Sequence, residues 1–179
     1  MKTFFISALL LLTHSIGWAD TATDSESATA VMDNQHLQTL IQGIASDVEG
    51  EPGFWKFELE GYQTMIITDE SADRMRIIVP IANMDEIDDE QLHRLMQANF
   101  DSALDARYST AKGVLWSAYI HPLSRLTDDQ FVDALAQTVN LAATFGTSYS
   151  SGSLIFGGGD SQGEQNKLYR EIMERKLSI

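Results

Sequence analysis

The sequence predicts an α+β domain in which helices pack against an antiparallel-type sheet. Apolar residues recur at helical spacing in three segments and at strand spacing in five others, in the order helix, three strands, helix, two strands, helix. Two of the helices open with matching capping boxes, at Asp88 and Thr127, each with a glutamine three residues further on. Short polar or glycine-containing turns join the strands, and such turns connect antiparallel neighbours.

The first predicted helix begins at Asp33 and carries one apolar stripe. The residues of this stripe are Leu37, Leu40, Ile41, Ile44 and Val48. Gly43 interrupts the pattern at a cost of about 1 kcal/mol relative to alanine, so it either ends the helix early or admits another backbone at close range. Residues 50–53, Gly-Glu-Pro-Gly, are expected to stop this element.

Three strands are predicted over residues 54–60, 62–68 and 74–81. In the first of them, Trp55 alternates with charged neighbours, which indicates a strand with one buried face. Pro80 cannot donate a hydrogen bond to a neighbouring strand, so it is expected at a sheet edge or at the end of its strand.

The stretch from Asp88 to Gly146 supplies the remaining elements. A helix from Asp88 is followed by a hairpin of residues 105–110 and 114–121, and then by a helix from Thr127. Gly146 is expected to terminate this last helix as a C-cap.

Composition divides the chain into one domain with appendages. The predicted parts are a signal peptide at residues 1–19, a flexible lead at 20–32, the α+β domain at 33–147, a Gly/Ser-rich linker at 148–163 and a short C-terminal helix at 164–179. Lys2, the apolar run at 4–12 and the small residues Gly17 and Ala19 indicate the signal, and the run is too short to span a bilayer comfortably. Cleavage after Ala19 would give a periplasmic or secreted protein without membrane insertion.

The chain is acidic and lacks cysteine. Its net charge is −14, and loss of Lys2 with the signal leaves 11 basic against 26 acidic residues, or −15. This charge argues against nucleic acid and anionic lipid as partners, and it permits a basic or apolar protein partner. The absence of cysteine excludes disulfides and thiol catalysis.

No motif for catalysis, a metal or a cofactor is found, so a non-enzymatic protein without a cofactor is predicted. The histidines of the mature chain, His36, His93 and His121, fall in different elements and form no H-E-x-x-H arrangement. The acidic run at 85–90 lacks the spacing and the central glycine of an EF-hand loop. Residues 146–159 contain neither a nucleophile elbow nor a phosphate-binding loop.

Four aromatic side chains on the predicted strands are candidate partner-binding residues: Trp55, Tyr62, Trp116 and Tyr119. Aromatic residues anchor protein interfaces, and a sheet covered by helices on one face can present them on the other. The alternative is that most of them belong to the core, because large aromatic side chains also concentrate there.

Several segments resemble one known fold: Leu-Met-Gln-Ala-Asn-Phe at 95–100, Gly-Val-Leu-Trp-Ser-Ala at 113–118, and Phe-Trp-Lys-Phe at 54–57 with Gly-Tyr at 61–62. Over residues 33–146 the chain resembles the type III secretion chaperone-like fold, including the YbjN-like group. The resemblance implies a small acidic α+β domain, often a homodimer, that binds protein segments and carries no cofactor. Secretion chaperones of this fold act in the cytoplasm, whereas the present chain is expected to be exported.

The leading functional hypothesis is an exported, non-enzymatic domain, chaperone-like or regulatory, that binds protein as a homodimer. The alternative is a periplasmic sensor of a small molecule or envelope component, with its ligand between the sheet and the last helix. A hydrolase is the third hypothesis, and it would need a histidine and carboxylates that converge in one cleft.

Overall fold

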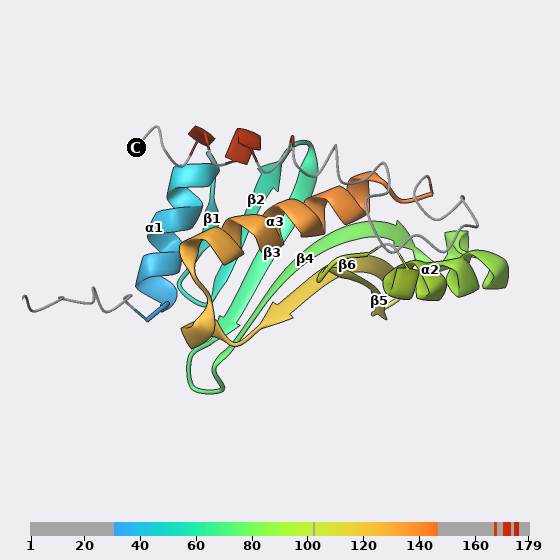
Figure 1. The fold of residues 1–179 in the computed structure, drawn as a ribbon, viewed down its shortest axis with the longest axis horizontal. Coiled ribbons are helices and arrows are strands. Elements are labelled where there is room, and N and C mark those ends of the chain that lie inside the picture. The colour runs from blue at the N-terminus through green and yellow to red at the C-terminus, as the bar shows by residue number, and fades with distance from the viewer. Residues whose placement is uncertain (1–30, 102, 147–166, 168–169, 173, 176–179) are drawn as a thin grey trace, which may run out of the picture.

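A computed structural model describes residues 31–101, 103–146, 167, 170–172 and 174–175. In the order of the chain, the elements are α1 (Asn34–Ile44), β1 (Glu49–Glu51), β2 (Phe54–Leu59), β3 (Tyr62–Asp69), β4 (Arg74–Asn83), the 3₁₀ turn η1 (Met84–Glu86), α2 (Asp89–Asp101), β5 (Arg107–Ala111), β6 (Val114–His121), the 3₁₀ turn η2 (Leu123–Arg125) and α3 (Asp128–Ala143). All strand pairs are antiparallel, in the order β1-β2-β3-β4-β6-β5. Helices α1 and α3 lie over the sheet, and α2 lies at its β5–β6 end (Figure 1). The predicted fold class is therefore confirmed.

The structure adds one strand to the predicted order. Strand β1 pairs Gly50 with Trp55 of β2, but its residues are all exposed, so no apolar alternation marks it in the sequence. At Gly50 the backbone has φ +106°, and a Cβ there would lie 2.2 Å from the carbonyl oxygen of Phe54. The glycine predicted to stop the first element thus permits a close strand pairing.

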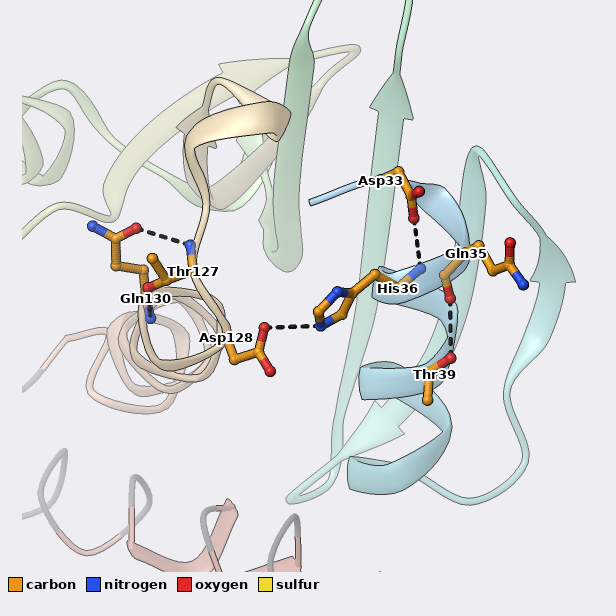
Figure 2. Close-up of polar contacts among 7 residues, drawn as sticks. All are labelled: Asp33, Gln35, His36, Thr39, Thr127, Asp128 and Gln130. Carbon is orange, nitrogen blue, oxygen red and sulfur yellow. Dashed lines mark hydrogen bonds and ion pairs between the residues drawn. The ribbon is translucent and has the colours of Figure 1, made fainter. Parts of the chain in front are cut away.

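The helices begin where their capping residues predict. For α2, the Asp88 N–H donates to Gln91 Oε1 at 3.1 Å and the Gln91 N–H donates to Asp88 Oδ1 at 2.8 Å. Thr127 and Gln130 form the same reciprocal pair at α3, at 3.0 and 3.2 Å (Figure 2). Both predicted capping boxes are confirmed.

Two expectations about where a strand and a helix end differ from the structure. Pro80 lies inside β4, a central strand between β3 and β6, where the pairing register shifts between Pro80 and Ala82. Pro80 therefore does not end its strand, but the pairing of β4 with β3 ends at Ile78, so Pro80 has a strand partner on the β6 side alone, as the expectation of an edge position implies. Gly146 has φ +81°, but α3 has already ended at Ala143 with Thr144 as its cap, two residues earlier.

The main core lies between the sheet and the helices α1 and α3. Trp55, Ile66 and Ile77 are neighbours across β2, β3 and β4, and all three are fully buried. Phe131 and Leu135 of α3 are buried in the same cluster. Each such side chain contributes roughly 1.5–3 kcal/mol relative to an exposed position. The sheet face that meets α1 and α3 therefore holds most of the stability.

A smaller core lies at the other end of the sheet. It joins Leu95 of α2 to Tyr108 of β5, Leu115 of β6 and Leu141 of α3. Asn99 of α2 accepts a hydrogen bond from the Tyr108 N–H at 2.7 Å and donates one to the Tyr108 carbonyl at 3.0 Å. The side chain of Asn99 thereby satisfies the backbone of β5 at its outer edge.

The described part of the C-terminal segment is helical and contacts the domain. Ile172 is fully buried in the main core, and the Arg175 guanidinium pairs with Glu60. The predicted signal peptide, most of the flexible lead and the Gly/Ser-rich linker lie outside the described residues.

Candidate functional site

The structure separates the four aromatic side chains predicted to bind a partner. Trp55 is fully buried with its ring N–H bonded to Gln38 of α1, and Tyr119 is only 8% exposed. Tyr62 is half-buried against the main core. Trp116 lies on the opposite face of the sheet, where its Nε1 donates to the Ala111 carbonyl at 3.0 Å. Of the four, Trp116 alone faces away from the helices; a partner-binding role for the four stays a prediction.

The face of the sheet opposite α1 and α3 is uncovered in the part of the chain that the structure describes. Cross-strand pairing aligns Phe54, Ile67, Arg76 and Ile120 in one row across β2, β3, β4 and β6. The adjacent rows contain Met65, Ile78, Ala118, Pro80 and Trp116. None of these side chains is buried, and Phe54 and Ile120 are 43% and 55% exposed. We call this surface the open sheet face.

A second apolar group lies on and just after α2. Met96 and Phe100 are four residues apart on the helix and are 47% and 71% exposed, and Leu104 after the helix is 49% exposed. Residues four apart lie on one side of a helix, so Met96 and Phe100 share one side of α2, and Leu104 lies beyond its end. We call this group the α2 stripe.

A cleft of about 380 Å³ opens between the end of β6 and α3. It is lined by Asp105, Tyr119, Ile120, His121, Gln130, Asp133, Ala134 and Gln137. Gln137 Oε1 accepts hydrogen bonds from the N–H groups of Asp105 and Ala106, at 2.9 and 3.4 Å. The Gln137 side chain therefore holds the segment that carries Asp105 against α3.

Charge is concentrated in this cleft. Partial burial, followed by the neighbouring charges of Asp129 and Asp105, raises the pKa of the Asp133 carboxyl above its usual value. Burial, followed by the charges of Asp105 and Asp133, raises the pKa of the Tyr119 hydroxyl. The cleft therefore disfavours negative charge and keeps Tyr119 protonated at neutral pH.

The cleft is unlike the site that the small-molecule hypothesis requires. It lies between the sheet and the last helix, as that hypothesis states, but polar side chains make up most of its lining. Ligand pockets are predominantly apolar and enclose most of their ligand. The geometry fits contact with a polar group better than capture of an apolar molecule.

Hydrolysis receives partial geometric support. His121 and the carboxylates of Asp105 and Asp133 share the cleft, but no serine or threonine lines it, and His121 Nδ1 lies 2.8 Å from the Pro122 carbonyl oxygen. His36 lies elsewhere, with its Nε2 2.9 Å from Asp128 Oδ1 between α1 and α3 (Figure 2), and His93 is exposed on α2. Within the described residues, no group of three potential ligands is placed to hold a metal ion.

Sequence reasoning expected an uncovered sheet face and a site between the sheet and the last helix, but it did not identify the residues that form them. A signal for the first is present at Met65-Ile66-Ile67, where apolar residues occupy both faces of the strand instead of alternating with polar ones. The cleft leaves no such signal, because Asp105 and Asp133 are brought together only by the packing of α3 on the sheet.

Comparison with solved structures identifies a shared fold. A chain of the crystal structure of the ExsC–ExsE complex superposes with a TM-score of 0.53 at 14% identity, over 68% of this chain and 100% of that chain. This likeness agrees with the predicted chaperone-like fold and, at such identity, indicates the fold alone. No family model and no curated protein sequence matches the chain.

Two further complexes show weaker likeness. A chain of the HopA1–SchA chaperone–effector complex has a TM-score of 0.48 at 10% identity, over 61% of this chain and 88% of that chain. The Yersinia pestis type III secretion chaperone SycH, in complex with a stable fragment of YscM2, has a TM-score of 0.48 at 14% identity, over 63% of this chain and 98% of that chain.

Among the described residues of the present chain, none of the helices has the length and apolar character needed to cross a bilayer.

Proposed function

We propose that this chain is an exported, non-catalytic domain that binds protein, and that it works as a homodimer. The observation that carries the proposal is the open sheet face, with Phe54 and Ile120 at 43% and 55% exposure among partly exposed apolar neighbours. The same face also carries the cationic side chains of Lys56, Arg76 and Arg107, and exposed apolar surface rimmed by polar residues marks interaction sites in soluble proteins. Trp116 lies within it and supplies an aromatic anchor of the type that interfaces favour.

The α2 stripe is the proposed self-association surface. Met96 and Phe100 belong to α2, which lies at the β5–β6 end of the sheet (Figure 1), and Leu104 follows that helix. Most homodimers have two-fold symmetry, in which the same patch of each copy meets itself. A small group of exposed apolar side chains suits that arrangement, because the group of one copy can pack against the same group of the other.

Light scattering after size exclusion tests the dimer on the mature chain beginning at Asp20. We expect a dimer at tens of micromolar, and we expect Phe100→Asp to convert it to a monomer because a carboxylate would be buried without a partner. Val31→Asp is the matched control, since Val31 is 66% exposed and lies outside the stripe. A monomeric wild-type chain at that concentration contradicts the homodimer.

Capture of partners from the native envelope tests the binding face. Proteins retained by the wild-type mature chain should be lost with Ile67→Asp, which places a charge in the middle of the open sheet face. Val31→Asp should retain them, and a chain lacking residues 148–179 tests the C-terminal segment once thermal unfolding shows that the domain stays folded without the buried Ile172. Equal retention by Ile67→Asp and wild type contradicts this face as the binding surface.

Export is a separate part of the proposal. It rests on the basic, apolar and small-residue pattern of residues 1–19. Mass spectrometry of the protein isolated from its native host should give an amino terminus at Asp20 and should find the protein outside the cytoplasm. A cytoplasmic protein that retains residues 1–19 contradicts export.

A further inference from the structure

We propose that the cleft between β6 and α3 binds one cationic group, the ammonium or guanidinium of a basic side chain presented by a protein segment. This inference rests on the proposed protein-binding function and names a side chain that the partner supplies. Four features of the cleft carry it.

The first feature is uncompensated negative charge. Asp105 and Asp133 both line the cleft, and neither forms an ion pair with a lysine or arginine among the residues that the structure describes. Asp129, one turn before Asp133, adds to the negative field at Asp133. A cation in the cleft would relieve the repulsion between these carboxylates.

The second feature is an unused hydroxyl. Tyr119 is 8% exposed and lines the cleft, yet its hydroxyl makes no hydrogen bond with a described residue. Tyr119 lines the cleft from β6, and its hydroxyl oxygen can accept a hydrogen bond from an N–H donor placed there.

The third feature is an apolar residue beside the charges. Ala134 of α3 lines the same cleft, whereas the side chain of Ile120, another lining residue, belongs to the open sheet face. Lysine and arginine place their methylene groups along apolar surface while the charged end reaches a polar partner. A small inorganic cation has no methylene groups to pack on an apolar residue. The described part of the chain also holds no cluster of three metal ligands.

The fourth feature indicates a chain segment as the carrier of the cation. Strand β5 begins at Arg107, which pairs with Ala118, so Tyr119, Ile120 and His121 of β6 have no strand partner on that side among the described residues. These three residues line the cleft. An extended segment can pair with such a free strand edge and place an alternate side chain beside it.

The test is a titration of the isotope-labelled mature chain, followed by NMR at neutral pH. The probes are N-acetyl-arginine methylamide, its neutral norleucine counterpart, spermidine as a free polyamine, and the peptide acetyl-Thr-Val-Arg-Val-Thr-amide. We expect the arginine probes to shift the amide signals of Ile120, Asp133 and Gln137, the norleucine probe to leave them unchanged, and the peptide to bind more tightly than the single residue or spermidine.

Three variants complete the design. Asp105→Asn combined with Asp133→Asn should weaken arginine binding about tenfold or more, which corresponds to about 1.4 kcal/mol or more. Tyr119→Phe retains the ring and should weaken arginine binding several-fold. Glu58→Gln removes an exposed carboxylate of β2 outside the cleft and should leave arginine binding unchanged. Each variant is first checked for a wild-type amide spectrum away from the cleft, so that misfolding is not read as lost binding.

Three results overturn the inference: equal shifts with the norleucine probe, unaltered arginine affinity in the double asparagine variant, or spermidine that binds as tightly as the peptide. The outcome is separable from that for the proposed function. The peptide should still bind to Phe100→Asp, which disrupts the dimer, and to Ile67→Asp, which alters the open sheet face, because neither residue lines the cleft.

Discussion

Asp73, in the turn between β3 and β4, holds the entry to α3 through Ser124, which follows 51 residues later. Its carboxylate accepts one hydrogen bond from the Ser124 N–H at 2.7 Å and another from the Ser124 hydroxyl at 2.8 Å. The turn of the sheet is thereby tied to η2, and hence to the start of the helix that covers the core.

This tie predicts a pH-dependent stability. The backbone N–H of Ser124, followed by its hydroxyl, lowers the pKa of Asp73 below the usual 3.8. A lowered folded-state pKa stabilises the fold above the unfolded value, and that stability is lost as pH falls through the folded value. Asp73→Asn should therefore lower Tm by a few degrees at pH 7 and by progressively less below pH 3.8.

Asp47→Asn is the matched control for that experiment. Asp47 also has a positive φ, 54° against 49° at Asp73, but no hydrogen bond to its side chain is present among the described residues. Thermal unfolding followed by circular dichroism from pH 7 to pH 2.5 measures both variants. An equal loss of Tm in the two variants would mean that backbone conformation, and not the Ser124 contact, is responsible.

The core predicts a sharp contrast between two isoleucines on neighbouring strands. Ile77 is fully buried in the main core, so Ile77→Ala should cost about 2–5 kcal/mol in the free energy of unfolding. Ile120 is 55% exposed on the open sheet face, so Ile120→Ala should cost less than about 1 kcal/mol in the absence of a partner. Urea denaturation measures both, and similar costs would argue that the open sheet face is buried in solution.

The ion pair between His36 and Asp128 should contribute little. Its atoms lie 2.9 Å apart, but the two side chains are 33% and 39% exposed. A double-mutant cycle with His36→Ala and Asp128→Ala should give a coupling of about 0.2–1 kcal/mol. The cycle is needed because Asp128 has a further interaction besides this one. A coupling well above this range would indicate that α1 and α3 depend on the pair for their packing.

Asp133 predicts the opposite pH dependence to Asp73. Partial burial, then Asp129 and Asp105, raises its pKa, so its charged form disfavours the fold and the penalty grows as pH rises from 3.8 through the folded value. Asp133→Asn should stabilise the unliganded protein by a few tenths of a kcal/mol at pH 7, a small value because the side chain is exposed enough for solvent to screen it.

The gain in Asp133→Asn should disappear below pH 3.8, where the wild-type carboxyl is protonated. Denaturation at pH 7 and pH 3 measures the difference, with Glu58→Gln as the control for a general change in net charge. A gain that persists unchanged at pH 3 would contradict electrostatic repulsion as its source.

Local chemistry explains what the sequence predicts well. A capping box needs only residues three apart, so Asp88 and Thr127 mark the starts of α2 and α3 without knowledge of the fold. The burial of Tyr119 depends instead on which face of the sheet α1 and α3 cover. Both faces of β6 carry apolar residues, so alternation alone does not say which of them will be packed.

Sequence patterns do not predict which distant residues form the candidate sites. Asp105 and Asp133 are 28 residues apart and belong to different elements, so their shared cleft exists only after α3 packs beside β6. Similarly, Pro80 lies within β4 where the pairing with β3 has already ended at Ile78 and the register with β6 shifts between Pro80 and Ala82. Tertiary structure determines both arrangements.

The register shift at Pro80 lies where the two cores of the molecule meet. Ile81, immediately after it, is the half-buried residue that packs against both the main core and the smaller core at the β5–β6 end. The smaller core has far fewer buried side chains, so α2 and β5 can open without disturbing β2 and β3. Amide protons of β5 should exchange with solvent deuterium faster than those of β3, and Ile81 marks the boundary between the two rates.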